Sequence, residues 1–439
     1  MQQTPIEVIG GGLAGTEAAY QVARRGLPVR LYEMRPGRTT PAHRTDLLGE
    51  LVCSNSLKAD TLSTAHGLLK AEMRRLDSIV LRTADATRVP AGSALAVDRT
   101  PFAQQLTAAI VHHPNITVVR EEVSELPVDR ITIVATGPLT STALTTQIQQ
   151  LLGHEHLYFY DALSPIVAAD SINYSKTFFA SRYAAGEGDD YLNCPLDRQT
   201  YEQLCAALVA AECVMPHAFE QELFFEGCLP IEEMARRGPH TLAFGPLKPV
   251  GLQRSDAPAP YAVVQLRLED RMRSAYNMVG FQTRLKYPEQ RRIFRTIPGL
   301  EQAEFLRLGS VHRNTFLNAP RLLKPTLQTR KRAEVFFAGQ ITGVEGYAES
   351  AATGLLAGLN AVALWCGRPL HVPPPTTAHG ALVHYIASAN AATFQPMNIN
   401  FGLLPPLDMP RGPKKARRAA MIARALADLA QWQRLVEGL

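Results

Sequence analysis

The stretch IEVIGGGLAGTEAAYQVARRGLPVRLYE, residues 6–33, decides the fold of this chain. Ile6–Ile9 is an apolar run that predicts a strand, Thr16–Arg25 predicts a helix closed by Gly26, and Pro28–Tyr32 predicts a second strand. Glycines 10, 12 and 15 form a G-x-G-x-x-G turn between the first strand and the helix. This β-α-β order predicts the start of an α/β nucleotide-binding fold.

The three glycines of this turn have distinct physical roles in a dinucleotide site. They allow a tight turn, a close approach of the backbone to a pyrophosphate, and close packing of the helix on the strand. The helix N-terminus offers N–H groups and a positive dipole end to the phosphates, and Glu33 is expected to accept hydrogen bonds from a ribose. The alternative is a glycine turn with a purely structural role. The predicted cofactor residues are Gly10, Gly11, Gly12, Leu13, Ala14, Gly15 and Glu33.

The pattern of a strand followed by glycine recurs twice in the chain. Ile131–Ala135 predicts a strand that ends at Thr136-Gly137, and Val335–Ala338 predicts one that runs into Gly339-Gln340 before a helix from about 348 to 365. We therefore expect residues 1–160 and 311–439 to form one α/β nucleotide-binding domain. This two-part arrangement resembles the Rossmann-like, glutathione-reductase-like domain of many flavoproteins, which implies FAD as the cofactor. Gly137, Gly339 and Gln340 are expected at the cofactor.

Residues 161–310 are expected to form an inserted α+β domain. Within it, Arg198–Cys213 predicts a helix, and Tyr261–Leu268 and Ala275–Phe281 predict strands.

Six cysteines lie at positions 53, 194, 205, 213, 228 and 366, without a C-x-x-C pair or a Cys/His cluster of ligand spacing. This pattern argues against a zinc site and against a disulfide scaffold, so no metal is expected. Cys205 has helical spacing to apolar neighbours, which predicts a core position. Cys213 and Cys366 lie at predicted helix ends and are expected to pack, and Cys194 is expected in a loop before Pro195.

Cys53 and Cys228 have surroundings that suit either chemistry or packing. Cys53 lies in the polar turn LVCSNSLK, with Lys58 five residues on. Cys228 lies in EGCLPIEE, where Pro230 suits the first position of a helix. A thiol just outside a positive helix end has a lowered pKa, although the two glutamates that follow oppose this effect if they face the sulfur.

The net charge of +5 comes from the C-terminal end. Seven basic and two acidic residues lie between 411 and 439, and the Ala- and Leu-rich run behind Pro413 favours a helix. Two interpretations of this basic helix remain open. It is either a solvated terminal face or a surface for an anionic partner, since Lys and Arg that neutralise backbone phosphates release counterions.

The composition of the 439 residues, with 46% hydrophobic and 19% charged, is that of a globular protein of two or three domains, which excludes disorder as the default. No apolar run approaches the roughly 18 residues of a membrane-spanning helix, and no signal region precedes Ile6. We therefore expect a cytoplasmic protein without a membrane partner. The sequence predicts no oligomeric state.

Eight stretches, in order along nearly the whole chain, resemble one family. They are VIGGGLAGTEAA (8–19), TPAHRTDLLGELVCSNSLKAD (40–60), YLNCPLDRQTYE (191–202), FFEGCLPIEEMARRG (224–238), MVGFQTRLKYPEQ (278–290), FLRLGSVHRNTFLNAP (305–320), FFAGQITGVEGYAESAATGLLAG (336–358) and PMNINFGLLPP (396–406). The chain thereby resembles the TrmFO family, the folate- and FAD-dependent tRNA (uracil-5-)-methyltransferases. The related flavoprotein MnmG (GidA) is similar at the first glycine turn and at Gly339-Gln340, but it has a different cysteine loop and a longer C-terminal region.

The resemblance implies methylation of C5 of the T-loop uridine, position 54, in tRNA. It implies that 5,10-methylenetetrahydrofolate supplies the carbon, that reduced FAD carries it as a methylene and reduces it, and that NAD(P)H re-reduces the flavin. Thiolate addition at C6 of uracil makes C5 nucleophilic. Motif match assigns Cys228 as that nucleophile and Cys53 as the partner thiol near the flavin, with the reverse assignment open.

The resemblance and the charge pattern also suggest substrate contacts. His312 is a candidate for stacking on the folate pterin, or else a hydrogen-bonded structural histidine. The candidate tRNA contacts are Lys414, Lys415, Arg417 and Arg418.

Two other functions remain as alternatives. One is a flavin-dependent NAD(P)H oxidoreductase or thiol–disulfide reductase that uses Cys53 and Cys228, and the lack of a C-x-x-C pair counts against it. The other is a non-catalytic flavoprotein that binds RNA through its basic helix.

Overall fold

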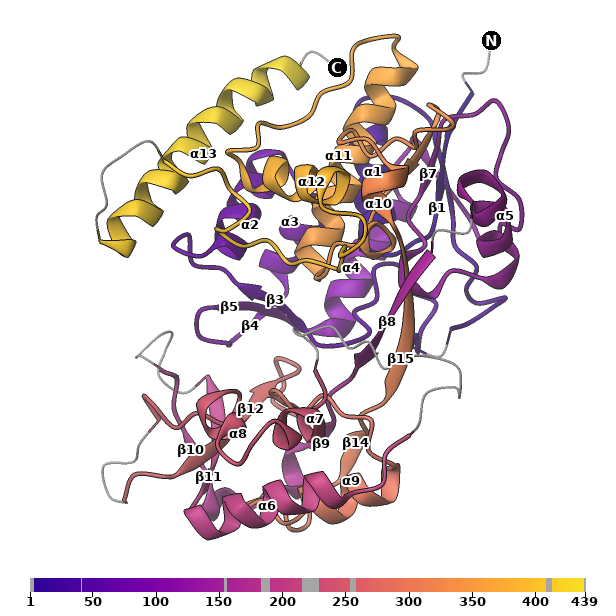
Figure 1. The fold of residues 1–439 in the computed structure, drawn as a ribbon. Helices are drawn as coiled ribbons and strands as arrows, with labels where there is room; N and C mark the ends of the chain where they lie inside the picture. Colours follow the sequence, from indigo (N-terminus) through magenta and orange to yellow (C-terminus); the bar gives the residue numbers. More distant parts are fainter. Residues whose placement is uncertain are drawn as a thin grey trace.

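The computed structural model describes residues 4–40, 42–153, 156–182, 190–214, 229–252, 258–407 and 413–437. Figure 1 shows two lobes, and both the first and the last described elements of the chain lie in the same one. We call the described residues before 154 and after 318 the first lobe, and those from 163 to 310 the second lobe. Each lobe has its own principal sheet and its own hydrophobic core.

The first lobe is built on a five-stranded sheet in which every pairing is parallel. Its strands, in spatial order, are β16 (Val335–Phe337), β7 (Thr132–Val134), β1 (Ile6–Ile9), β2 (Val29–Tyr32) and β6 (Ile116–Val119). Strands from both ends of the chain therefore lie in one sheet with β1 at its centre. The predicted α/β class with a Rossmann-like parallel sheet is confirmed.

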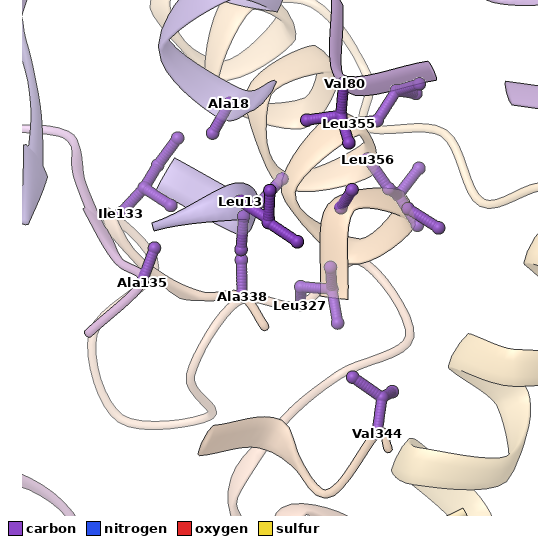
Figure 2. Close-up of a cluster of buried hydrophobic side chains, with 14 of the residues drawn as sticks. Leu13, Ala18, Val80, Ile133, Ala135, Leu327, Ala338, Val344, Leu355 and Leu356 are labelled. Atoms are coloured by element: carbon purple, nitrogen blue, oxygen red, sulfur yellow. The ribbon is translucent and has the colours of Figure 1, made fainter. Parts of the chain in front are cut away.

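Two helices pack against each other and against this sheet. α1 (Leu13–Ala23) begins three residues earlier than the sequence predicts, and α11 (Tyr347–Trp365) begins one residue earlier. A Cβ added at Gly354 would lie 2.1 Å from the Ala14 carbonyl oxygen, so the two helices approach as closely as only glycine allows. Figure 2 shows how side chains from both helices and from the sheet fill the space around this contact, among them Leu13, Ala18, Ile133, Ala338, Leu355 and Leu356.

The other helices of the first lobe cover the sheet and carry the C-terminus. They are α2 (Ala65–Arg75), α3 (Ile79–Ala86), α4 (Arg99–Val111), α5 (Thr142–Leu152), α10 (Ala319–Leu322), α12 (Ala378–Ser388) and α13 (Lys414–Val436). The buried carboxylate of Glu72 on α2 accepts hydrogen bonds from the first N–H groups of α12, at Ala378 (2.7 Å) and His379 (2.9 Å). This carboxylate therefore caps α12 from a neighbouring helix. A small sheet, β3 (Ser56–Ala59), β5 (Ala94–Val97) and β4 (Arg88–Val89), borders the second lobe.

The second lobe is an antiparallel six-stranded sheet with helices against one face. Its strands, in spatial order, are β10 (Phe178–Phe179), β11 (Tyr191–Leu196), β12 (Ala262–Leu268), β13 (Ala275–Met278), β9 (Ile166–Ala168) and β14 (Phe305–Arg307). Leu192, Leu266 and Met278 lie opposite one another on the apolar face and join a buried core. The helices of this lobe are α6 (Arg198–Ala210), α7 (Ile231–Arg236), α8 (Thr241–Phe244) and α9 (Tyr287–Phe294).

The opposite face of this sheet is polar and meets the first lobe. Tyr191, Arg267 and Asn277 lie side by side in the strand register. The Tyr191 hydroxyl donates to the Ala91 carbonyl (3.1 Å), and the Arg267 Nε donates to Asn55 Oδ1 (3.0 Å). The contact between the lobes is therefore made largely by hydrogen bonds.

An antiparallel ribbon of β8 (His156–Ala162) and β15 (Val311–Leu317) joins the lobes, as Figure 1 shows. Both strands begin or end close to the expected domain limits at 160 and 310, and the exact limits stay a prediction.

Candidate functional site

The glycine turn after β1 leaves open the space in front of the first N–H groups of α1, where a phosphate group would bind. Gly10 has a φ of +109°, and a Cβ on it would lie 2.5 Å from the Ala135 carbonyl oxygen. A Cβ on Gly15 would lie 1.8 Å from the Gly10 oxygen, so Gly15 allows α1 to pack on the turn. A Cβ on Gly12 would meet no atom within 4 Å. Gly12 therefore keeps the approach to the first N–H groups of α1 open.

A pocket with about 1080 Å³ of empty space, its open mouth included, lies at the carboxyl ends of the parallel strands. Nearly all of the predicted cofactor residues line it: Gly10, Gly11, Gly12, Leu13, Ala14, Glu33, Gly137, Gly339 and Gln340. Gly15 lies behind the lining. The first turn of α1 carries no acidic residue, and the positive end of its dipole faces the pocket. Size, position and donor groups fit a dinucleotide such as FAD.

Glu33, expected to bind a ribose, is held by Arg35, which the sequence did not indicate. Glu33 Oε1 accepts from the Arg35 Nε (2.9 Å) and backbone N (3.0 Å), and Oε2 accepts from Arg35 Nη2 (3.0 Å) and Gly11 N (3.2 Å). Burial alone would raise the pKa of Glu33, but the hydrogen bonds and charge of Arg35 outweigh it and lower the pKa. Glu33 is therefore a carboxylate locked in place, and its contact with a ribose stays a prediction.

His43 adds a neutral side chain to the same end of the pocket. Its Nδ1 lies 2.6 Å from Thr40 Oγ1, and both residues line the pocket. Burial lowers the pKa of His43 to about 4, and the charge of Arg35 acts in the same direction. His43 is therefore uncharged at neutral pH.

The second glycine turn brings the start of α11 to the pocket. Gly339 has a φ of +82°, and its N–H donates to Thr353 Oγ1 on α11 (2.8 Å). Tyr347 and Ser350, in the first turns of α11, line the pocket beside Gln340. The N-terminal end of a second helix therefore faces the pocket.

Cys53 lies next to this pocket, in a loop held from three sides. Its N–H donates to the Tyr347 hydroxyl (2.7 Å), and its carbonyl accepts from Arg99 Nη2 (3.0 Å) and Arg307 Nη2 (2.6 Å). The side chain is half-buried, and the preceding Val52 lines the pocket. The three supporting residues come from α4, β14 and α11, so no local sequence pattern predicts that they contact Cys53.

Lys58, noted five residues after Cys53, belongs to a different cluster. Its Nζ contacts Asn398 Oδ1, and it lies near the buried Glu349, which also accepts from His66 Nδ1 (3.1 Å). Burial raises the pKa of Glu349, but Lys58 and His66 outweigh it and lower the pKa to about 2. This ionic cluster fixes the first turn of α11.

Cys228 lies outside the described residues, and so does the side chain of His312, whose backbone belongs to β15. The described chain resumes at Leu229, and Pro230 is the cap of the short helix α7. Glu232 accepts from Thr283 Oγ1 (2.8 Å) and Arg284 N (2.9 Å), so it is engaged by the second lobe.

Two expectations about the other cysteines are wrong. Cys194 lies in β11 and is fully buried, where burial raises its pKa; Pro195 is accommodated because β10 pairs with β11 only at Leu192 and Asn193. Cys366 is exposed, because it is the residue that ends α11. Cys205 is buried in the core of the second lobe, as predicted, and Cys213 is half-buried.

The predicted basic helix is α13. Its inner face buries Met421, Ala425, Leu429 and Trp432, and Arg75 on α2 donates to the Leu426 carbonyl (3.1 Å). Lys414, Lys415 and Arg417 are exposed, whereas Arg418 lies over the Phe401 ring at 5.3 Å. The first turns of α13 therefore present a concentrated positive charge to solvent.

The part of the chain that the structure describes has neither a candidate membrane span nor a metal-binding cluster. No helix in it is long and apolar enough to cross a bilayer. Among the same residues, no group of three or more His, Cys, Asp or Glu side chains is arranged to hold a metal ion.

Comparisons with known proteins agree on one group of enzymes. The model of the family described as glucose inhibited division protein A matches residues 5–369. The chain is 57% identical over 428 residues to the methylenetetrahydrofolate–tRNA-(uracil-5-)-methyltransferase TrmFO of Geobacter sulfurreducens, covering 97% of this chain and 98% of that protein. It is 57% identical to the TrmFO of Moorella thermoacetica, covering 96% of each. A crystal structure of Aquifex aeolicus GidA is similar in fold, with a TM-score of 0.70 at 17% identity over 98% of this chain and 73% of that one.

Proposed function

This chain belongs to the TrmFO family of methylenetetrahydrofolate–tRNA-(uracil-5-)-methyltransferases, and we propose from this premise how its own residues share the reaction. The chain is an enzyme that methylates C5 of uracil in tRNA, with FAD and a folate carbon donor. The finer proposal is that the target is the T-loop uridine at position 54 and that NAD(P)H supplies the electrons. A cytoplasmic location is proposed because tRNA is the substrate.

The pocket of the first lobe is the proposed FAD site, and it carries this proposal. The open face of Gly12 and the N–H groups of α1 would hold the pyrophosphate, and the start of α11 would face the ring system. Bound FAD supplies the one-carbon carrier and the reducing equivalents. Arg35 fixes the carboxylate of Glu33 in this wall of the pocket.

The two cysteines are proposed to divide the work at the pyrimidine. A Cys228 thiolate would add to C6 of uracil, which makes C5 nucleophilic toward the carbon unit. After the new C–C bond forms, a base would take the C5 proton, and the S–C6 bond would break with its electron pair returning to sulfur, which restores the C5=C6 double bond. Cys53, beside the pocket, is the proposed partner thiol. His312 is the proposed contact of the folate pterin.

The exposed first turns of α13 are proposed to bind the tRNA backbone. Lys414, Lys415 and Arg417 are solvent-exposed, and Arg418 continues the same positive region. The target uracil must leave its stacked position, which costs a few kcal/mol, and backbone contacts offset part of that cost.

One assay tests this function. Purified holoenzyme, labelled methylenetetrahydrofolate and unmodified tRNA should give label at the T-loop uridine, and the Cys228→Ala variant should keep its bound yellow flavin and lose methyl transfer. Cys366→Ala is the matched control, because this exposed cysteine ends α11 and should not affect the rate.

Two results would contradict the proposal. Full activity of Cys228→Ala would end its role as the nucleophile. NAD(P)H turnover without any need for tRNA or folate, and without labelled tRNA, would favour a simple flavin oxidoreductase instead.

A further inference from the structure

The polar face of the second-lobe sheet supplies arginines to the Cys53 loop. In a regular strand, the side chains of Phe305 and Arg307 would point to the same face of the sheet. A β-bulge between these two residues of β14 turns their side chains in different directions. Phe305 packs near Phe294 in the second-lobe core (6.3 Å between rings), whereas Arg307 reaches the first lobe. There its Nη1 donates to the Val52 carbonyl (3.1 Å) and its Nη2 to the Cys53 carbonyl (2.6 Å).

Arg99 binds the same loop from the first lobe. Its Nη1 donates to the Leu51 carbonyl (2.5 Å) and its Nη2 to the Cys53 carbonyl (3.0 Å). Two guanidinium groups therefore share one carbonyl oxygen, that of the cysteine itself.

A third arginine, Arg267 on β12, lies beside this loop with an unused donor. It is only 8% exposed, its Nε donates to Asn55 Oδ1 (3.0 Å), and its Nη2 has no hydrogen-bond partner among the described residues. A buried guanidinium N–H without an acceptor is costly, so this donor is available to a further hydrogen-bond acceptor beside the loop.

The charges around Cys53 leave an excess of cations. The cations are Arg99 on α4, Arg267 on β12 and Arg307 on β14. The Glu269 carboxylate faces them, and its Oε2 is paired with Arg99 Nε (2.5 Å). Tyr347 on α11 also lies beside this loop, and burial raises the pKa of its hydroxyl group, so it stays neutral. Burial lowers the pKa of Arg267 and of Arg307, and a negative charge on Cys53 acts against that lowering.

We propose that Arg267 and Arg307, from the second lobe, are positioning residues that hold Cys53 as a thiolate. Its proton passes to solvent, and the two guanidinium charges stabilise the anion that remains. The cysteine belongs to the first lobe, and these two cations belong to the second lobe and add to the charge of Arg99, which the first lobe supplies. The reactive form of Cys53 therefore depends on contact between the lobes. The use of this thiolate in methyl transfer rests on the proposed function.

The test is the pH dependence of Cys53 alkylation in the flavin-loaded protein. Trypsin releases Cys53 in the peptide 45–58, so its labelling by iodoacetamide can be followed separately from that of the other cysteines by mass spectrometry. We expect the rate to rise with an inflection well below the ordinary thiol value of about 8.5. Arg267→Gln and Arg307→Gln should move the inflection upward and slow labelling near pH 7 by roughly three- to tenfold. Arg267→Lys and Arg307→Lys, which keep the charge, should largely restore it.

The matched control is Arg271→Gln, which removes another arginine between the lobes. Arg271 donates to the Arg88 and Ala86 carbonyls, away from Cys53, and its loss should leave the inflection in place. The proposal would be overturned if labelling of Cys53 in the native protein had its inflection near the ordinary thiol value. It would also be overturned if the glutamine variants had the same inflection as the native protein. Flavin absorbance and thermal unfolding report on folding. If Arg307→Gln fails to fold, the inflection of the native protein and the comparison of Arg267→Gln with Arg267→Lys still test the proposal.

Labelling needs neither tRNA nor folate, so the two proposals fail separately. A thiolate in a protein that transfers no methyl group would contradict the proposed function and leave this inference standing. Methyl transfer by a protein whose Cys53 titrates normally would do the reverse.

Discussion

A methyl group added at Gly12 would enter open space, whereas one added at Gly15 would clash with the backbone. An added Cβ at Gly12 has no atom within 4 Å, and its φ of −75° suits any residue. We expect Gly12→Ala to keep the stability of the protein but to weaken FAD binding by about tenfold or more, because the methyl group takes the space that the pyrophosphate needs. Gly15→Ala should instead lower the free energy of unfolding by about 1–3 kcal/mol, since its methyl group would press on the Gly10 oxygen.

Flavin titration and thermal unfolding of the cofactor-free protein separate these effects. Each variant serves as the control for the other, since both add one methyl group to the same turn. Native FAD affinity in Gly12→Ala would show that no phosphate approaches there.

At the scale of elements, the two ends of α13 should differ in their effect on tRNA binding. Replacing Lys414, Lys415 and Arg417 together by alanine should weaken binding and reduce the slope of log affinity against log salt by about two to three, because each neutralised phosphate releases counterions. The helix should persist, since its buried face is untouched. Arg434→Ala, which removes an exposed cation in the last turn, is the control. Equal slopes in the triple variant and the native enzyme would exclude this end of α13 from the RNA contact.

Some elements can be predicted from residues that are adjacent in sequence, whereas others depend on distant parts of the chain. β1, α1 and β2 follow from spacing within residues 6–33, because strand, turn and helix there are adjacent in sequence. Pro195 predicts a loop at Cys194, and only the short length of β10 explains why a proline fits in β11. Cys53 itself is a candidate from its motif, but the residues that support it cannot be predicted from neighbouring sequence. Its supports, Arg99, Arg307 and Tyr347, are brought to the loop by tertiary structure alone.

At the scale of the whole molecule, Asn55 is one of the side chains that link the lobe of the proposed FAD pocket to the sheet of the second lobe. Its Nδ2 donates to the Leu268 carbonyl (2.8 Å) and to the Val97 carbonyl of its own lobe (3.0 Å), while its Oδ1 accepts from Arg267. Asn55→Ala leaves these buried groups without partners, so we expect a loss of about 1–3 kcal/mol in the free energy of unfolding. Flavin binding should persist, because the pocket is lined entirely by the first lobe.

Methyl transfer by Asn55→Ala should fall well below the native rate, because Arg267 loses its anchor beside Cys53. The matched control is Asn115→Ala. The Asn115 Nδ2 donates to the Ala23 carbonyl (2.9 Å), a bond of the same kind but wholly within the first lobe. Both variants should lower the melting temperature, and only Asn55→Ala should lose activity while its flavin spectrum stays native. If Asn55→Ala transferred methyl groups at the native rate, the contact between the lobes would serve stability alone, and the chemistry would have to be contained in one of them.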